Sequence, residues 1–247
     1  MTLMFDHVTI RVADLAASER LYRTMLGQLG IEPTYADVNL VAWSDFSIAA
    51  ADSQHPPTGH LHLAFVSPTR EDVEAFWRAG LSAGGQDDGA PGERPQYTDS
   101  YYGAFLRDPD RNSAEAVIHN DVRRGGNIDH LWIRVRDLNA ATAFYDTVAR
   151  HTGLREGRRW KEGRQFRGAW ATFSLVADGT SATENLHVAF SAPDKRTVQD
   201  FHRTAVTAGF LDNGTPGERT HYGPGYYSAY VLDPEGTNVE SVFHQRR

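Results

Sequence analysis

Two stretches of this chain, far apart in the sequence, are nearly the same. Residues 5–22 read FDHVTIRVADLAASERLY, and residues 128–145 read IDHLWIRVRDLNAATAFY. The third position of each copy is a histidine, His7 in the first and His130 in the second, and these lie 123 positions apart. A long internal repeat restricts the possible folds to those in which one structural unit is built twice along the chain.

The repeat continues to the end of the chain, with an offset that changes once. LHLAF at residues 61–65 returns as LHVAF at 186–190, and residues 101–119 return as 226–244, so the later offset is 125. We therefore predict a tandem duplication, with module one at residues 1–122 and module two at residues 127–247. The polar, glycine-containing stretch NDVRRGGN between them is predicted to be the linker.

Within each copy the hydrophobic pattern changes from a strand period to a helix period and back. Val8, Ile10 and Val12 alternate with polar residues, which is typical of a half-buried strand. Asp14 stands where a helix N-cap is expected, and apolar residues at helical spacing follow it. Three short strand-like segments then complete a β-α-β-β-β order. We predict an α+β protein in which four βαβββ units form two tandem modules, with curved sheets around concave metal-binding clefts.

Composition limits the class of protein. The chain has 247 residues and is 40% hydrophobic, enough for two domains with a buried core. A net charge of −7 without a basic block argues against nucleic acid and membrane surfaces as partners. The absence of cysteine excludes disulfides and thiolate ligands. No apolar run long enough for a bilayer and no signal-peptide pattern are seen, so we expect a cytoplasmic protein.

The polar faces of the predicted strands carry two histidines and one glutamate in each copy. Alternation places these side chains opposite the apolar residues, on the concave side of the sheets. Two imidazoles and a carboxylate on one face form a metal site with open positions, suited to Fe(II), Zn, Mn, Ni or Co. Such a divalent ion would bind a small-molecule substrate through adjacent oxygens. The predicted metal ligands are His7, His62, Glu115, His130, His187 and Glu240.

At these residues the sequence resembles the vicinal oxygen chelate superfamily, which includes glyoxalase I, extradiol dioxygenases, thiol transferases and bleomycin-binding proteins. The DH-x-x-I-x-V-x-DL opening and the DP-(D/E)-x(4)-E ending carry the resemblance, which covers nearly the whole chain. The superfamily pattern implies that the same six residues are metal ligands. Glyoxalase I usually has a further glutamate, but the corresponding segments here, FSIAAA and TFSLVA, contain no carboxylate.

Module two also resembles the extradiol dioxygenases, whose signature has a histidine, a tyrosine, a D-P-x-G turn and the ligand glutamate. His221, Tyr230 and Glu240 follow this order, which implies that Tyr230 and His221 are catalytic groups. Module one has Phe105 in place of the tyrosine. Module two, however, lacks the extra histidine expected before the second ligand, and the dioxygenases lack ligands in their first module.

Other residues on the predicted concave faces are candidates for substrate contacts. Arg11 and Arg134 follow the first ligand of each copy and could hold a carboxylate or phosphate, or could be ordinary charged strand ends. Trp132 could contact an apolar substrate or simply fill space. His119 and His244 follow each glutamate by four residues and are expected to support the ligands, to act in acid–base chemistry, or to lie on the plain surface.

Two points stay open in the sequence. His7 could join His62 and Glu115 in its own module, or His187 and Glu240 in the other. The sequence favours a divalent-metal-dependent enzyme, either a glyoxalase-like lyase or isomerase or an extradiol-type dioxygenase. The alternative is a binding protein that sequesters a small molecule and confers resistance without catalysis. The chain is expected to be a monomer or a homodimer.

Overall fold

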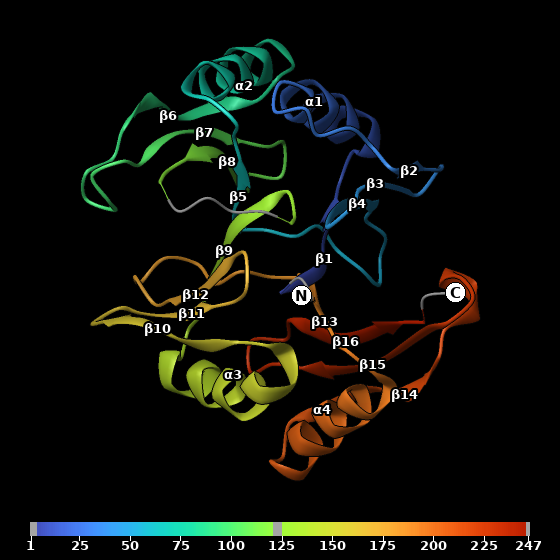
Figure 1. Cartoon of the computed structure of the whole chain (residues 1–247). Coiled ribbons are helices and arrows are strands. Elements are labelled where there is room, and N and C mark those ends of the chain that lie inside the picture. The colour runs from blue at the N-terminus through green and yellow to red at the C-terminus, as the bar shows by residue number, and fades with distance from the viewer. Residues whose placement is uncertain (1–3, 121–124, 246–247) are drawn as a thin grey trace. The chain divides into compact units, whose positions relative to one another are not determined.

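The computed structural model describes residues 4–120 and 125–245, and within them the β-α-β-β-β order occurs four times (Figure 1). The first two repeats are β1 (Phe5–Val12), α1 (Leu15–Gly27), β2 (Tyr35–Ala36), β3 (Leu40–Trp43) and β4 (Phe46–Ala50), then β5 (His62–Val66), α2 (Arg70–Ser82), β6 (Gln86–Glu93), β7 (Tyr102–Arg107) and β8 (Ser113–Ile118). The last two are β9 (Ile128–Arg134), α3 (Leu138–Thr152), β10 (Arg155–Trp160), β11 (Gly163–Arg167) and β12 (Thr172–Val176), then β13 (His187–Ser191), α4 (Lys195–Thr207), β14 (Leu211–Glu218), the short 3-10 helix η1 (Thr220–Tyr222), β15 (Tyr226–Leu232) and β16 (Asn238–His244).

The chain divides into two compact units whose bounds cross the sequence repeat. Unit 1 contains Met1–Val8 and Ile133–Arg247, and unit 2 contains Thr9–Trp132. Strands β1 and β9 therefore each begin in one unit and end in the other. The modules at 1–122 and 127–247 follow the sequence repeat rather than spatial contacts, and that division stays a prediction. Residues 121–124 of the predicted linker lie outside the described residues.

Hydrogen bonding joins the strands into two curved, mixed sheets of eight strands each. Their orders are β14-β15-β16-β13-β1-β4-β3-β2 and β10-β11-β12-β9-β5-β8-β7-β6. The pairs β13–β16 and β5–β8 are parallel, whereas their neighbours β15–β16 and β7–β8 are antiparallel. The predicted α+β class with four βαβββ units is confirmed.

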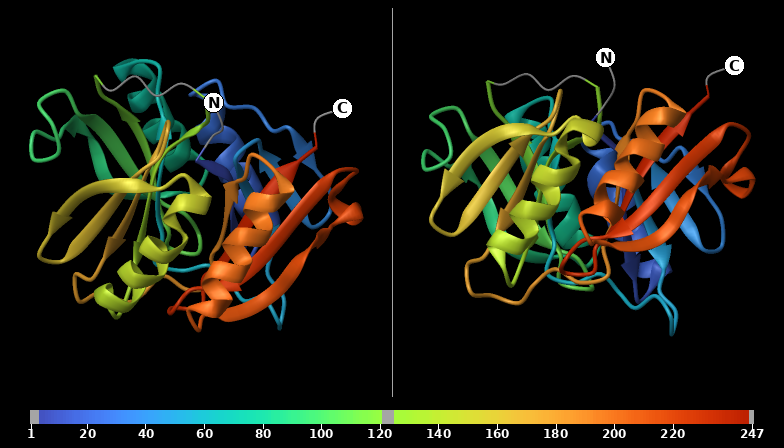
Figure 2. Two further views of the ribbon diagram at one scale, coloured as in Figure 1. Left: turned by 60° about the horizontal axis from the view of Figure 1, so that its bottom comes forward. Right: turned by 90° about the horizontal axis from the view of Figure 1, so that it is seen from below.

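Each unit has two helices packed against each other on the outer side of its strands. Helices α1 and α2 lie side by side in unit 2 (Figure 1), and α3 and α4 do so in unit 1 (Figure 2). The predicted N-cap is confirmed, because the Asp14 side chain accepts a hydrogen bond from the backbone N–H of Ala17. Asp137 caps α3 in the same way. No helix in the described part of the chain is long and apolar enough to cross a membrane.

Aromatic side chains fill the space between helices and strands in both units. In unit 2 the ring of Phe46 packs against Tyr22 of α1 and meets Phe65 of β5 edge-on, so it joins two βαβββ repeats. In unit 1 Phe173 contacts both Tyr145 of α3 and Phe190 of β13 in similar geometries. These rings are fully buried, and each contributes on the order of 2–3 kcal/mol through burial. The apolar faces of the strands are used for this packing, so their polar faces remain available for the candidate functional site.

A buried tyrosine–aspartate bond connects a helix to the turn before β8 in unit 2 and to the turn before β16 in unit 1. Tyr22 of α1 donates its hydroxyl to Asp108 at 3.0 Å, and Tyr145 of α3 donates to Asp233 at 3.0 Å. Asp108 also accepts the backbone N–H of Asn112 at 2.8 Å. These aspartates begin the DP turns that the repeat contains, so the turns are structural parts of the fold.

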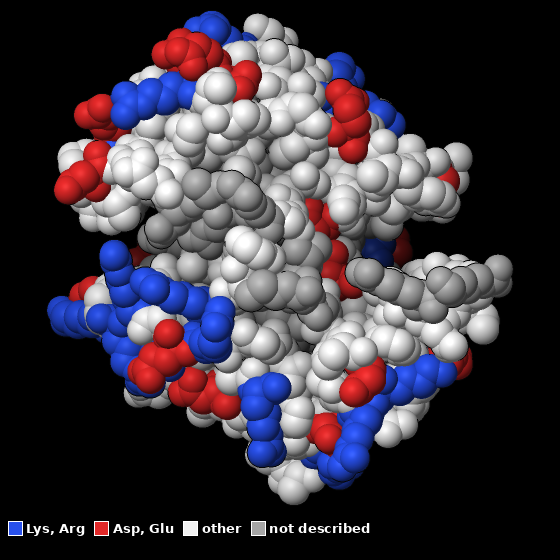
Figure 3. All heavy atoms as spheres, viewed as in Figure 1, with Lys and Arg blue, Asp and Glu red and all other residues white. Residues whose placement is uncertain are grey.

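Basic residues gather over the edge strand β10 and its neighbour β11 in unit 1 (Figure 3). Arg155, Arg158 and Arg159 of β10 are exposed. An edge strand offers unpaired backbone groups to other chains, and charged side chains oppose such pairing. We attribute these positive charges to a role in preventing the edge strand β10 from pairing with strands of other chains.

The turn at Asp108 predicts a pH-dependent contribution to stability. Burial raises the pKa of this carboxyl to about 6, even though the hydrogen bonds from Asn112 and Tyr22 favour its ionised form. The folded protein thus binds the proton more tightly than the unfolded chain, and the free energy of unfolding falls as the pH rises from about 4 to about 6. Asp108→Asn should remove this fall, which amounts to about 3 kcal/mol at most.

Urea unfolding of the wild type and Asp108→Asn at several pH values measures this difference. The exposed Asp99→Asn provides the matched control and should follow the wild type. Parallel stability profiles for the wild type and Asp108→Asn would contradict the argument.

Candidate metal centres

The structure brings the six predicted ligands together as two groups of three. His7, His187 and Glu240 form centre 1 in unit 1, and His62, Glu115 and His130 form centre 2 in unit 2. Each group could hold a metal ion, since the ligand atoms lie within 4.8 Å of one another. The first histidine of each sequence copy thus joins the second histidine and the glutamate of the other copy. This observation answers the question that the sequence left open.

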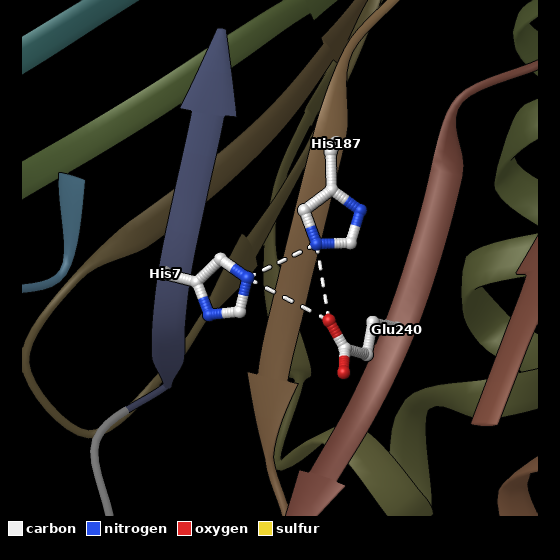
Figure 4. Close-up of side chains that lie close together, drawn as sticks. All are labelled: His7, His187 and Glu240. Atoms are coloured by element: carbon white, nitrogen blue, oxygen red, sulfur yellow. Dashed lines mark hydrogen bonds and ion pairs between the residues drawn. The ribbon is translucent and has the colours of Figure 1, made fainter. Parts of the chain in front are cut away.

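Centre 1 is built from three neighbouring strands, β1, β13 and β16 (Figure 4). His7 Nε2 lies 3.0 Å from His187 Nε2, and the latter lies 3.0 Å from Glu240 Oε2. The third side, from His7 Nε2 to Glu240 Oε2, is 3.6 Å long. All three side chains point toward one another from the same face of the sheet.

Centre 2 has nearly the same geometry on β5, β8 and β9. His62 Nε2 lies 3.0 Å from Glu115 Oε2 and 3.1 Å from His130 Nε2. His130 Nε2 lies 3.4 Å from Glu115 Oε2. Because both centres use the same atoms at similar distances, the duplication has reproduced the geometry of the site as well as its residue types.

Strand register explains why the three ligands can meet. In unit 2, Ala64 of β5 pairs with Glu115 on one side and with His130 on the other, so a small side chain lies between the two ligands. In unit 1, Ala189 of β13 pairs with Glu240 in the same way. Both alanines are fully buried. A methyl group at this position leaves room for the ligand atoms above the sheet.

Each ligand also has a partner on its far side. Asp6 lies 2.9 Å from His7 Nδ1, and Asp129 lies 2.8 Å from His130 Nδ1. Tyr226 donates its hydroxyl to Glu240 Oε1 at 2.8 Å, and Tyr101 donates to Glu115 Oε1 at 2.6 Å. Such outer contacts hold metal ligands in position and fix the histidine tautomer.

The remaining histidine nitrogens are also contacted. His62 Nδ1 lies 3.1 Å from the hydroxyl of Ser113. The side-chain amide of Asn238 donates from Nδ2 to His187 Nδ1 at 3.0 Å. Both contacts hold the rings with Nε2 toward the other ligands of each centre.

A bulge explains why the sequence analysis missed Asp129. Strict alternation would put Asp129 and His130 on opposite faces of β9. The register between β5 and β9 shifts at this point, because Ala64 pairs with His130 whereas Phe65 pairs with Ile128. Asp129 is the extra residue of the bulge, and its carboxylate can turn back to the ring of His130. In the sequence, this aspartate and its counterpart in the other copy were indicated only by the DH dipeptide that both copies contain.

The protonation of the ligands reflects their mutual contacts. Burial raises the pKa of Glu115, but the hydrogen bonds of His130 and His62 outweigh it, and the net effect is a lowered pKa. Burial lowers the pKa of His130, but its bonds with Asp129 and Glu115 raise the net value to about 9. The same balance lowers the pKa of Glu240 and raises that of His7. Without a cation, a proton therefore reduces the repulsion between the converging atoms.

The donor set fits a divalent metal ion. A carboxylate only accepts hydrogen bonds, so the contacts with Asp6 and Asp129 place the proton on Nδ1 of His7 and His130. The Nε2 lone pairs of these rings then point at another imidazole nitrogen and at a carboxylate oxygen. Three electron-rich atoms about 3 Å apart repel one another unless a cation or proton lies between them.

The surroundings of the two centres differ. The side chains of His7 and His187 are 22% and 21% exposed, whereas those of His62 and His130 are 12% and 7% exposed. Trp132 lies against both histidines of centre 2, with ring centroids 5.7 and 5.9 Å away. Phe105 lies 5.9 Å from His62. Centre 2 is therefore the more enclosed and the more aromatic of the two.

Tyr230 is the predicted catalytic residue that the structure places next to a centre. It pairs directly with Glu240 across β15 and β16, and its ring lies 6.2 Å from that of His187. Burial, followed by the charge of Glu240, raises its pKa, so the phenol keeps its proton at neutral pH. Ser228 donates a hydrogen bond to the Tyr230 oxygen at 3.0 Å.

The other predicted site residues make different contacts. His221 lies exposed in η1, where its ring contacts Tyr222 at 4.1 Å, and its catalytic role stays a prediction. Arg11 donates to the backbone oxygen of Ala50, and Arg134 donates to Asp178. These bonds fix the two arginines at strand ends, and their roles as substrate contacts likewise stay predictions. Trp132 is the predicted substrate residue that contacts the ligands.

Comparison with known protein families supports the resemblance seen in the sequence. Residues 4–116 match the family model of the Glyoxalase/Bleomycin resistance protein/Dioxygenase superfamily. Residues 4–116 therefore belong to that superfamily. The second half of the chain repeats the first, so the resemblance seen in the sequence is confirmed. Among curated proteins, the comparison found no match.

Solved structures of the superfamily show how far the fold is shared. Glyoxalase I from Zea mays is 20% identical, covers 97% of this chain and 92% of its own, and has a TM-score of 0.69. A glyoxalase/bleomycin resistance protein from Albidiferax ferrireducens T118 is 34% identical over 46% of this chain and 98% of its own, with a TM-score of 0.43. The maize structure shows that the fold extends over both repeats.

The alanine between the ligands provides a test of the geometry. We expect Ala64→Leu to block metal binding at centre 2, because the larger side chain fills the space between Glu115 and His130. The cost in stability should be about 1–3 kcal/mol, as for other overpacked cores. Metal content measured by mass spectrometry should fall at centre 2 alone.

Ala189→Leu is the matched variant and should block centre 1 while leaving centre 2 intact. A folded Ala64→Leu protein that binds as much metal as the wild type would contradict the proposed position of the ion.

Proposed function

We propose that this chain is a divalent-metal-dependent enzyme that binds a small molecule through two adjacent oxygen atoms. The observation that supports this proposal is the convergence of two imidazoles and one carboxylate at each centre. The ligand set is suited to Fe(II), Zn, Mn, Ni or Co. A bound ion would act as a Lewis acid or would bring oxygen and substrate together.

The number of protein ligands supports a site with open positions. Each centre has three ligands, and strands β4 (FSIAA) and β12 (TFSLV) contain no carboxylate that could add a fourth. Sites with three protein ligands keep positions for water or substrate, whereas structural sites are usually closed. A substrate with adjacent hydroxyl or carbonyl groups would occupy two such positions.

We propose centre 1 as the main catalytic centre. Tyr230 offers a phenolic proton close to His187 and Glu240, whereas centre 2 has Phe105 at the equivalent position. A protonated tyrosine can donate a hydrogen bond to a substrate oxygen and can supply a proton to it. Ser228 donates a hydrogen bond to the phenol oxygen and holds it in position. The greater exposure of the centre 1 histidines gives a substrate easier access.

The reaction proposed is that of a glyoxalase-like lyase or isomerase, or that of an extradiol-type dioxygenase. Oxygen consumption separates these two classes. Turnover of catechols with uptake of one O2 per product would assign the dioxygenase reaction. Product formation at the same rate under anaerobic conditions would assign the lyase or isomerase reaction.

Ligand variants test the proposal. Glu240→Ala and His187→Ala should abolish turnover, since each removes a ligand of centre 1. Tyr230→Phe should keep its metal and lose about 100-fold in kcat, as expected when an acid–base group is removed. Steady-state kinetics and metal analysis on the same preparations measure both effects.

Glu115→Ala is the matched variant at centre 2 and should retain most of the activity. Full activity of Glu240→Ala together with loss in Glu115→Ala would transfer the reaction to centre 2. A protein that binds a small molecule without turnover under any of these conditions would instead be a binding protein.

A further inference from the structure

Each centre has a second histidine–aspartate contact that the ligand set does not require. The carboxylate of Asp129 contacts two imidazoles, with Oδ1 at 2.8 Å from His130 Nδ1 and Oδ2 at 2.8 Å from His119 Nε2. In centre 1 the carboxylate of Asp6 lies 2.9 Å from His7 Nδ1 and 2.9 Å from His244 Nε2. An outer histidine thus contacts the ligand histidine through one carboxylate.

The same outer histidines also contact the tyrosines that hold the glutamate ligands. The ring of His119 stacks on Tyr101 at 5.9 Å with an angle of 13° between the planes. The ring of His244 meets Tyr226 edge-on at 4.9 Å. Each outer histidine therefore touches both sides of its centre, the aspartate behind the first ligand and the tyrosine behind the glutamate.

The outer contacts occur in both halves of the chain. His119 and His244 are equivalent positions of the repeat, and so are Tyr101 and Tyr226. The walls of the two centres have changed, because Phe105 in one corresponds to Tyr230 in the other. A contact that both copies contain, while other positions differ, is consistent with a requirement that both centres share.

We propose that His119 and His244 are positioning residues that, through Asp129 and Asp6, hold the first histidine of each centre in the tautomer and orientation needed for metal binding. This inference rests on the proposed metal function. The outer histidine donates its N–H to one carboxylate oxygen, so the carboxylate is fixed with its other oxygen toward Nδ1 of the ligand ring. The ligand ring then keeps its proton on Nδ1 and its lone pair on Nε2.

The two centres should depend on this contact to different degrees. The side chain of His119 is 9% exposed and that of Asp129 is 3% exposed, so little water can replace a lost donor. The side chain of His244 is 52% exposed, and water can take its place beside Asp6. Loss of a donor costs more at a buried carboxylate than at one that water can reach. The effect of removing the outer histidine should therefore be larger at centre 2.

Metal affinity of single centres provides the first test. Glu240→Ala leaves centre 2 intact and Glu115→Ala leaves centre 1 intact, so Zn(II) titrations in these backgrounds report one centre each. His119→Phe keeps the ring next to Tyr101 but removes the donor, and it should weaken Zn(II) binding at centre 2 by about 10- to 100-fold. His244→Phe should weaken binding at centre 1 by less than about 10-fold.

The tautomer of the ligand histidine provides a second readout that needs no metal. At a pH above the His130 pKa of about 9, where the ring is neutral, nitrogen NMR of the metal-free protein distinguishes a proton on Nδ1 of His130 from one on Nε2. The wild type should show the Nδ1–H form, His119→Phe should show a mixture, and His119→Gln, whose amide can still donate, should restore both tautomer and affinity. His55→Phe alters an exposed histidine that contacts Asp52 outside both centres, and it should change nothing.

The outcomes separate this inference from the proposed function. Unchanged Zn(II) affinity and unchanged tautomer in a folded His119→Phe protein would overturn the positioning role while leaving the metal function in place. A wild type that binds no Zn(II) would overturn the metal function, and the NMR readout would still decide whether the outer histidine fixes the ligand ring. If His119→Phe does not fold, His119→Leu, which also lacks a donor, takes its place in both measurements.

Discussion

The repulsion between three converging electron-rich atoms is the constraint on which this structure depends. At each centre two imidazole nitrogens and one carboxylate oxygen lie within 3.0–3.6 Å of one another. Such an arrangement is unfavourable without a cation or a proton, so the rest of the protein must hold the ligands together. Asp6 and Asp129 orient the first histidines, and Tyr226 and Tyr101 orient the glutamates. The apolar faces of the same strands pack on the helices, and this packing stabilises the strands that carry the ligands.

The duplication supplies the strands that the centres need. Centre 1 uses the start of β1 from the first copy with β13 and β16 from the second, and centre 2 uses β9 from the second copy with β5 and β8 from the first. Each centre therefore forms only when both copies are present in the fold. The difference between Tyr230 and Phe105 then gives one centre a phenol hydroxyl that the other lacks. Two similar centres with different walls are what a duplication followed by divergence would produce.

Much of this arrangement could be predicted from the sequence, and the exceptions have physical reasons. Alternation and the repeat predicted that His62 and Glu240 lie on the polar faces of their strands, because the period of a strand is a local property. The partner of His7 could not be predicted, since pairing between β1 and β13 depends on contacts distant in sequence. Asp129 was missed because a bulge interrupts the alternation at that residue. His221 followed a sequence signature, and the structure places it in the exposed turn η1, where its ring contacts Tyr222, so its catalytic role stays a prediction.

The most direct test of the central claim is the metal content of the purified chain after dialysis and reloading, aerobically and anaerobically. Mass spectrometry should find two equivalents of a divalent metal per chain, one for each group of ligands. One equivalent would show that a single centre binds metal. No metal after reloading, in a protein that is folded, would contradict the account and would leave the converging histidines and glutamates without a cation to hold.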